Sequence, residues 1–471
     1  MTAEKAPAPS ANHCSKNLRE WLTHLAATDR LAVAKPGVGL VHELAAVSDQ
    51  LELDKAVLFP KPDGHEIPVA ANLLASRKWI GDCLGVSEDD LIARYQDAVR
   101  NPLPWVEVED APVQAVVHTD VDINGQLPVP THNELDSGPY IAAGLMISRN
   151  PKNGIQNVSI HRCQISGKDR IGVLLLPRHT WTYSQMAEEA GQALEVAIVI
   201  GVDPASLLAS QAIVPMDFDE MEIVGALHGA PVEMVKCKTN NVRVPAHAEI
   251  VLEGRVLPGV AEPEGPFGEF PQYYGRRANR HVIQVDTITH REGAIFHTIV
   301  GGGMEHLLLG GLPREATILE SLQRHDPAVL DVHLSRGGIC RYHLVVKIDK
   351  KQEGQAKNIM MGAFAAHYDI KQVVVVDKDV NIHDGEAVEW AIATRFQADQ
   401  DLLVVNNTQA SKLDPTTTDG GVGAKMGLDA TIPLAADDFT FTVIKVPGAG
   451  DVDLDAVLDD ASAATAIIAN E

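Results

Sequence analysis

The chain has 471 residues, a hydrophobic content of 45% and a formal net charge of −25. This length predicts two or three domains with substantial apolar cores. The negative charge argues against a nucleic-acid partner, because even nonspecific binding uses clustered Lys and Arg side chains. An anionic ligand would need a local pocket of cationic side chains, a metal ion or backbone N–H groups.

The sequence carries no signal for a membrane or for export. No apolar run is long enough to span a bilayer, and the start, MTAEKAPAPSANHC, lacks the basic and apolar regions of a signal peptide. Five widely spaced cysteines without a CxxC motif predict neither a disulfide framework nor a thiolate zinc site. We therefore expect a cytoplasmic protein.

Residues 1–110 predict an α/β cap behind a Pro/Ala-rich tip that we expect to be disordered. The segment LREWLTHLAATDRLAVA from Leu18 has the apolar spacing of one amphipathic helix. Ser87 is the expected N-cap of a later helix that reaches Val99. The other expected elements are helices over 42–51 and 76–84 and strands in AVLFP and EIPVAANLL.

In residues 111–312 the sequence pattern predicts many short strands separated by turn residues, and one helix is expected over 182–194. This pattern is typical of a β-barrel or sandwich and not of a parallel sheet, and we predict a barrel. A linking helix is expected from Pro313 to Arg324, with Pro313 in its first turn. The predicted linking segment is 313–330.

Residues 331–450 alternate strands with helices, which predicts a separate α/β domain. Helices are expected over 355–366 and 385–396. The alanine-rich end, within residues 451–471, predicts a helix whose apolar side could pack on a neighbouring subunit. The fold class predicted for the whole chain is α+β.

Two glycine clusters, Gly301–Gly303 and Gly420–Gly423, lack the spacing of a Rossmann or Walker nucleotide site. Lys425 follows the second cluster and could reach an anion, although a lone lysine is usually solvated.

Glu264 and Glu269 lie five residues apart in VAEPEGPFGEFPQYYG. The Gly and Pro residues around them favour irregular backbone for both carboxylates. Two nearby acids push their pKa values apart, so that one ionises and the other carries a proton. A surface turn with solvated acids is the alternative interpretation.

Further polar groups precede these acids in order along the chain. GIQNVSIHRCQIS carries Asn157, His161 and Arg162, LLPRHTW carries Arg178 and His179, and DEMEIVGALHG carries Glu220 and Glu222. With PEGPFGEF, these segments resemble the UbiD family of prenylated-flavin-dependent decarboxylases. MEHLLLGGLPREA, VVVVDKDV, EWAIATR and AKMGLDAT are also similar to the family, so the resemblance runs from about residue 18 to 445.

The resemblance implies that Arg162, Glu264 and Glu269 form a catalytic network, with Glu269 as proton donor and Glu264 ionised against Arg162. It implies a split β-barrel domain that binds prenylated FMN and a C-terminal domain that mediates dimerisation. Implied cofactor contacts are Asn157, Ser159, Ile160, His161, Arg162, Arg178, His179, Glu220 and Lys425. From the residues alone, His161 is a strand-face side chain.

Asn157, His179 and Glu220 match the family's ligands for a divalent ion, Mn²⁺ or Mg²⁺, that holds the cofactor phosphate; K⁺ or Na⁺ is also implied. Amide, imidazole and carboxylate donors suit a hard cation. Glu222 is the competing ligand, and the spacing of Glu220 to GALHG favours Glu220. Because Asn157 and Arg162 lie an odd number of positions apart, a strand between them must bulge or end if both face one site.

Loss of CO₂ from an unsaturated carbon needs an electron sink, which no side chain supplies. The resemblance therefore implies a reversible decarboxylase of aromatic, heteroaromatic or α,β-unsaturated acids, with pyrrole-, indole- or furan-carboxylates as the nearest branch. His306, beside the triple glycine, could donate to the substrate or could be structural. A flavin prenyltransferase is the implied cofactor supplier, and the chain is expected to form a homodimer or hexamer. The alternatives are a flavin oxidoreductase using unmodified FMN, or an inactive metal-binding scaffold.

Overall fold

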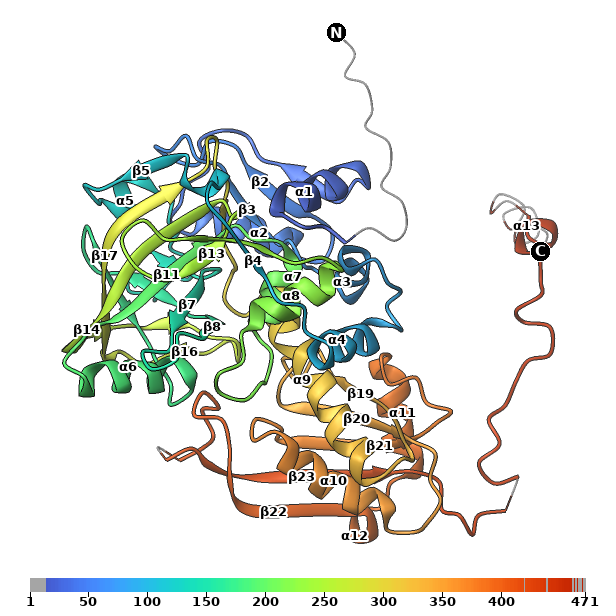
Figure 1. Ribbon diagram of the computed structural model, residues 1–471. Coiled ribbons are helices and arrows are strands. Elements are labelled where there is room, and N and C mark those ends of the chain that lie inside the picture. The colour runs from blue at the N-terminus through green and yellow to red at the C-terminus, as the bar shows by residue number, and fades with distance from the viewer. Residues whose placement is uncertain are drawn as a thin grey trace.

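The computed structural model describes residues 14–418, 420–437 and 439–459, together with 461, 464 and 468. The N-terminal and central parts form one body, and the C-terminal sheet lies below it, joined through the long helix α9 (Met304–His325) (Figure 1). After the last strand, the chain runs away from the body as an extended segment (Figure 1). The mixed architecture confirms the predicted α+β class. The expected disordered tip lies outside the described residues.

The N-terminal helix α1 (Leu18–Ala27) begins at Asn17, whose side chain accepts the N–H of Glu20. The predicted helix was too long, because Asp29 adopts a positive φ of 57° and the chain then enters strand β1. Helix α4 (Leu91–Arg100) also starts later than predicted, with Asp90 and not Ser87 as its N-cap. The remaining elements of this part are β1 (Leu31–Val33), α2 (Glu43–Leu51), β2 (Ala56–Phe59), β3 (Val69–Ala71) and α3 (Arg77–Leu84).

The central part is built on a nine-stranded sheet in the order β6-β9-β10-β17-β14-β11-β7-β8, with β5 also paired to β17. Its two longest strands, β14 (Ile250–Glu264) and β17 (Ala278–His290), pair antiparallel with a register shift at Glu253/Gly254. Such bulges bend a sheet, and the sheet curves into a half-barrel. The other strands are β5 (Val116–His118), β6 (Tyr140–Ile141), β7 (Leu145–Arg149), β8 (Gln156–Ile160), β9 (Cys163–Ile165), β10 (Arg170–Val173) and β11 (Leu194–Ile200).

Short helices and strands surround this sheet. Helix α6 begins earlier than predicted, at His179, and three helices were not predicted: α5 (Ile123–Gln126), α7 (Pro204–Ala209) and α8 (Glu220–His228). Strand β18 completes a small sheet with β1, β2 and β3. The bounds of the remaining elements are β4 (Val106–Val108), α5 (Ile123–Gln126), α6 (His179–Glu189), β12 (Glu233–Lys236), β13 (Arg243–Pro245), β15 (Phe267–Gly268), β16 (Tyr274–Gly275) and β18 (Phe296–His297).

Helix α9 starts nine residues before the predicted linking helix, so Pro313 lies inside it and not in its first turn. The preceding Gly310 and Gly311 pack directly under the C-terminal part, where a Cβ on Gly310 would collide with the guanidinium of Arg341. The close packing of α9 against the central and C-terminal parts stabilises the helix by more than the one backbone hydrogen bond that Pro313 removes.

The C-terminal sheet has the order β19-β20-β21-β23-β22. Helix α10 (Gln355–Ala366) agrees with its predicted range, and α11 (Gly385–Arg395) begins at the predicted residue. The other elements are β19 (Val329–Leu334), β20 (His343–Ile348), β21 (Gln372–Asp377), α12 (Ala398–Asp401), β22 (Leu402–Gln409), β23 (Val422–Ala430) and the short α13 (Leu454–Val457). Most of the predicted C-terminal helix lies outside the described residues.

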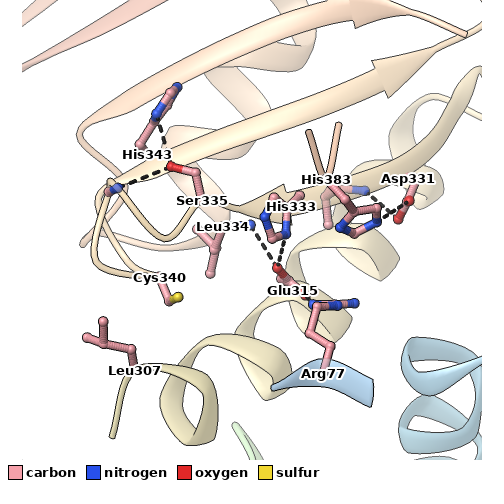
Figure 2. A network of polar contacts seen from close by, with 12 residues as sticks. Arg77, Leu307, Glu315, Asp331, His333, Leu334, Ser335, Cys340, His343 and His383 are labelled. Atoms are coloured by element: carbon pink, nitrogen blue, oxygen red, sulfur yellow. Dashed lines mark hydrogen bonds and ion pairs between the residues drawn. The ribbon is translucent and has the colours of Figure 1, made fainter. Parts of the chain in front are cut away.

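One buried carboxylate joins three parts of the chain (Figure 2). Glu315 of α9 accepts hydrogen bonds from Arg77 of α3, from His333 Nδ1 at 3.0 Å and from the Leu334 N–H at 2.8 Å. Burial opposes ionisation of Glu315, but the charges of Arg77 and His333 outweigh it and hold the pKa at about 2. No helix among the described residues is long and apolar enough to cross a membrane.

Candidate active site

Arg162 lies between the two predicted acids. Its Nη2 donates to Oε2 of Glu264 at 2.7 Å, and its Nη1 donates to Oε1 of Glu269. Glu264 is fully buried and Glu269 is 9% exposed, so the three charges interact in a site with little solvent. A low local dielectric strengthens such charge-assisted hydrogen bonds.

The backbone around these acids is more regular than predicted. Glu264 is the last residue of the central strand β14. Glu269 alone lies in a loop, directly after the short strand β15. The Gly–Pro pair that should disrupt the strand begins one residue after Glu264, so β14 extends up to it. The strand therefore fixes one carboxylate and the loop presents the other.

Neighbouring polar groups hold Glu264 in place. The Tyr140 hydroxyl donates to Oε1 of Glu264 at 3.2 Å, and it also donates to Oε1 of Gln164 at 3.1 Å. The same Gln164 oxygen accepts the N–H of Gly265 at 3.0 Å. Arg162 lies over the ring of Phe267 at 5.5 Å. The sequence analysis missed Tyr140, which lies on strand β6 where no motif marks it. It also did not single out Gln164, although Gln164 lies two residues after Arg162 in GIQNVSIHRCQIS.

Gly275 forms one wall of the site. A Cβ on Gly275 would lie 2.8 Å from Nη1 of Arg162 and 3.2 Å from Oε1 of Glu269. A Cβ on Gly301 would likewise lie 2.3 Å from the carbonyl oxygen of Gly268. The sequence analysis did not single out Gly275, and its glycine-rich surroundings were the only signal for it.

The three predicted metal ligands meet around strand β8. His179 Nδ1 donates to Oδ1 of Asn157 at 3.0 Å, and Glu220 Oε2 accepts the N–H of Val158 at 2.7 Å. Asn157 lies on β8, His179 begins α6 and Glu220 begins α8. Strand β8 ends at Ile160, which confirms the expected break between Asn157 and Arg162.

The donor set fits a cation. Glu220 is 3% exposed and pairs with no cationic side chain in the described part of the chain, and burial raises its pKa to about 8. Burial and the nearby Arg178 lower the pKa of His179, which keeps its imidazole neutral. A buried carboxyl without a counter-charge, next to a neutral imidazole and an amide oxygen, suits a hard divalent ion. No group of three His, Cys, Asp or Glu side chains suited to a metal occurs in the described part of the chain, and this trio uses Asn157 as its third member.

The segment between the two groups connects them. His161 Nε2 contacts the Ser159 hydroxyl at 2.9 Å, and its Nδ1 contacts the Leu174 carbonyl at 3.3 Å. Burial lowers the pKa of His161 to about 4, so the ring is neutral. Both ring nitrogens are engaged by the protein, which agrees with the structural interpretation of His161. The buried Nε–H of Arg162 has no hydrogen-bond partner among the described residues, and a bound cofactor could accept a hydrogen bond from it.

Arg178 and Lys425 line a cavity of about 670 Å³ between the central and C-terminal parts, together with Phe364, Tyr368 and Thr408. Arg178 donates to the Tyr368 hydroxyl at 2.9 Å. Lys425 is 3% exposed and donates to the carbonyls of Tyr368 and Ile370 at 2.8 and 2.7 Å. Burial lowers the pKa of Lys425 to about 8. Lys425 is thus a buried cation and not the solvated side chain of the alternative interpretation.

His306 belongs to a third group, next to the acids. Phe270, which follows Glu269, meets the His306 ring at 6.3 Å and lies under Arg341 at 5.2 Å. Burial and the charges of Arg341 and Arg314 lower the pKa of His306 to about 3. No carboxylate pairs with Arg314 or Arg341 among the described residues, and burial lowers the pKa of both. The sequence analysis did not single out these arginines.

Comparison with known families covers most of the chain. Residues 22–99, 105–304 and 307–430 match the N-terminal, Rift-related and C-terminal domains of 3-octaprenyl-4-hydroxybenzoate carboxy-lyase, respectively. The chain is 42% identical over 371 residues to the anhydromevalonate phosphate decarboxylase of Methanothermobacter thermautotrophicus, covering 79% of this chain and 87% of that protein.

Solved structures of UbiD-class and related decarboxylases have the same fold as this chain. The UbiD-class enzyme HmfF from Pelotomaculum thermopropionicum in complex with FMN has a TM-score of 0.92 and 46% identity, over 94% of this chain and all of that one. The 3,4-dihydroxybenzoic acid decarboxylase from Enterobacter cloacae has a TM-score of 0.86 and 28% identity, over 93% of this chain and 98% of that one.

The fold and the matches define the class: this is a UbiD-class, prenylated-FMN-dependent decarboxylase. The chain belongs to the UbiD family of carboxy-lyases, and the resemblance drawn from its motifs is confirmed.

Proposed function

We propose that the protein catalyses reversible, non-oxidative decarboxylation of an aromatic, heteroaromatic or α,β-unsaturated acid, with Arg162, Glu264 and Glu269 as its catalytic residues. The observation that carries this proposal is the bridging of both acids by Arg162 in a nearly dry site. When bound, prenylated FMN supplies the electron sink that decarboxylation requires.

The chain's own residues then have distinct tasks. Glu264, which accepts hydrogen bonds from Arg162 and Tyr140, is held as an acceptor and positions the guanidinium. Glu269 lies at the less buried side of Arg162 and delivers a proton to the carbon that has lost CO₂. The reverse direction uses the same groups, because each step must be reversible.

The cofactor would be held at its phosphate end. We propose that Asn157, His179 and Glu220 bind Mn²⁺ or Mg²⁺ there, with contacts from Ser159, Ile160, His161, Arg162, Arg178 and Lys425. The buried, uncompensated carboxyl of Glu220 supports the cation, and two cations on one cavity, Arg178 and Lys425, support an anionic group nearby. The accompanying K⁺ or Na⁺ rests on the resemblance alone.

Two buried cations narrow the substrate class. Arg314 and Arg341 form no ion pair in the described part of the chain and share the charge of one buried carboxylate, Asp369, and an uncompensated buried charge is costly. We infer that the substrate carries a second anionic group, such as a carboxylate or a phosphate, that pairs with them. A relative at 42% identity is named for a phosphorylated substrate, which supports this class but does not decide between the two groups. His306, neutral and adjacent, would contact the same end of the substrate.

A homo-oligomer is also proposed, as a dimer or hexamer. Strand β22 forms the sheet edge with Leu402 and Val404 38% and 51% exposed, and Ile444 in the extended segment is 95% exposed. Exposed apolar edges of this kind are commonly covered by a second chain.

The test compares protein made with and without a flavin prenyltransferase. We expect CO₂ release from a panel of unsaturated acids only with that partner. Turnover that follows unmodified FMN and NAD(P)H would instead support the oxidoreductase, and no turnover with no bound flavin would support the scaffold.

A further inference from the structure

Two thiols from opposite ends of the N-terminal part lie together, remote in sequence from every proposed site residue. Cys14 is the first described residue, and Cys83 lies in the last turn of α3. The Ser15 N–H donates to the Cys83 carbonyl at 3.2 Å, which places the two cysteine backbones side by side. Each thiol shifts the pKa of the other, so the two side chains face one another. Adjacent backbones with facing thiols are the arrangement from which a disulfide closes.

A histidine–carboxylate pair acts electrostatically on the Cys14 thiol. His228, at the end of α8, contacts Oδ1 of Asp203 through Nε2 at 2.9 Å. Asp203 is itself fixed, because its Oδ2 accepts the Ser206 hydroxyl at 2.6 Å. Both side chains are almost fully buried, at 6% and 7% exposed. The carboxylate therefore orients an imidazole that can take a proton from a neighbouring thiol.

The electrostatics favour Cys14 as the attacking thiol. The hydrogen bond from Cys83 and the charge of His228 lower the pKa of Cys14, although burial opposes them. Burial raises the pKa of the Cys83 thiol, which is fully enclosed. Cys14 is 9% exposed, so a small oxidant can reach it first. Reactive cysteines combine a favoured thiolate with some access to solvent.

We propose that Cys14 and Cys83 form a reversible redox pair, in which a peroxide converts the two thiols into a disulfide. The Cys14 thiolate, after its proton passes to His228, attacks one peroxide oxygen and becomes a sulfenic acid while the other oxygen leaves as water. The Cys83 thiol then attacks that sulfur, forming the S–S bond and releasing a second water. Two sulfurs are oxidised by two electrons in total, and one hydrogen peroxide is reduced to two waters. A dithiol reductant reverses the change.

The experiment treats the full-length protein with hydrogen peroxide and maps its peptides without reduction. We expect a peptide that joins Cys14 to Cys83 and disappears on reduction, while Cys163, Cys237 and Cys340 stay as thiols. The variant Cys14→Ser should lose the cross-link and Cys237→Ser, a buried thiol without a cysteine partner, should keep it. Because Cys14 is 9% exposed and Cys83 is fully buried, Cys14→Ser tests the proposal even if Cys83→Ser does not fold.

The role of the histidine has its own readout. His228→Asn should slow cross-link formation by about tenfold or more, since the thiol then lacks its proton acceptor. Peroxide treatment that leaves both thiols free in folded protein, drives Cys14 to a sulfinic acid without a cross-link, or joins two chains through Cys14 would overturn the proposal. An unchanged rate in His228→Asn would overturn the assignment of His228.

Discussion

Nη2 of Arg162 donates to Oε2 of Glu264 at 2.7 Å, while Nη1 of the same guanidinium reaches Glu269. The two acids thus differ in environment although they share one cation. Glu264 also accepts the Tyr140 hydroxyl and is fully buried, whereas Glu269 follows a two-residue strand and keeps some contact with solvent. This asymmetry suits one permanent acceptor and one proton donor.

Replacing Glu269 with Gln should lower turnover by at least about a hundredfold, because the amide cannot deliver the proton. The cofactor should stay bound, as measured by its absorbance after gel filtration. Glu262→Gln is the matched control, because Glu262 lies on β14 and pairs with Arg170, away from Arg162. Wild-type turnover in Glu269→Gln would refute the donor role.

Gly275→Ala should also impair turnover, because its Cβ would lie 2.8 Å from Nη1 of Arg162. The guanidinium must shift, and loss of alignment at a catalytic group commonly costs about a hundredfold in rate. Steady-state kinetics and circular dichroism would separate this effect from unfolding. The control is Gly385→Ala, where nothing lies within 4 Å of the added Cβ. A fully active Gly275→Ala would show that Arg162 tolerates displacement.

Substitutions at the proposed metal site can distinguish Glu220 from Glu222 as the metal ligand. Glu220→Gln should weaken Mn²⁺ binding at least about tenfold, because it removes the only negative charge of the trio. Glu222→Gln, two residues along the same helix, should leave binding unchanged. Electron paramagnetic resonance of free Mn²⁺ measures both, and His179→Ala should release metal and flavin together. Loss of binding in Glu222→Gln alone would reverse the ligand assignment.

Arg314→Met should raise KM about tenfold or more for acids with a second anionic group, because a charge-assisted hydrogen bond is lost. Acids without that group should be unaffected, and a KM series over matched acid pairs measures the difference. Arg324→Met is the control, since Arg324 lies on the same helix with its side chain 72% exposed. Equal effects on both acid types would argue against the inferred substrate class.

The Glu315 junction predicts a pH-dependent contribution to stability. The folded pKa of about 2 lies below the ordinary 4.5, so the stabilisation is complete above pH 4.5 and is lost as pH falls towards 2. Glu315→Gln should lower the free energy of unfolding by about 3–5 kcal/mol at neutral pH, because it removes the buried charge partner of Arg77 and leaves only the more distant, half-exposed Glu88 at 3.8 Å. Urea titrations measure this, with the more exposed Glu320→Gln expected to change it by less than about 1 kcal/mol. Equal stability of wild type and Glu315→Gln at neutral pH would contradict the prediction.

The sequence was informative where a local pattern determines the structure. Helix α10 and the break after Ile160 follow from periodicity and strand parity, and ordered motifs identified the family. Long-range packing decided the rest: α9 runs through Pro313, and Tyr140 contacts Glu264 from strand β6, which no motif marks. The buried cations Arg314 and Arg341 were missed because their burial without an ion pair among the described residues is visible only in three dimensions. The domain boundaries and the roles of the site residues stay predictions.

Helix α9 has a mechanical consequence. It spans 22 residues, or about 33 Å at the usual helical rise, from the Gly301–Gly303 turn beside Glu269 to the C-terminal sheet. A helix transmits displacement along its length, and Gly301 has no free space against Gly268 to absorb it. We therefore expect that a tilt of the C-terminal sheet would displace the turn that packs on Gly268 and Glu269, and so change the position of the proposed proton donor.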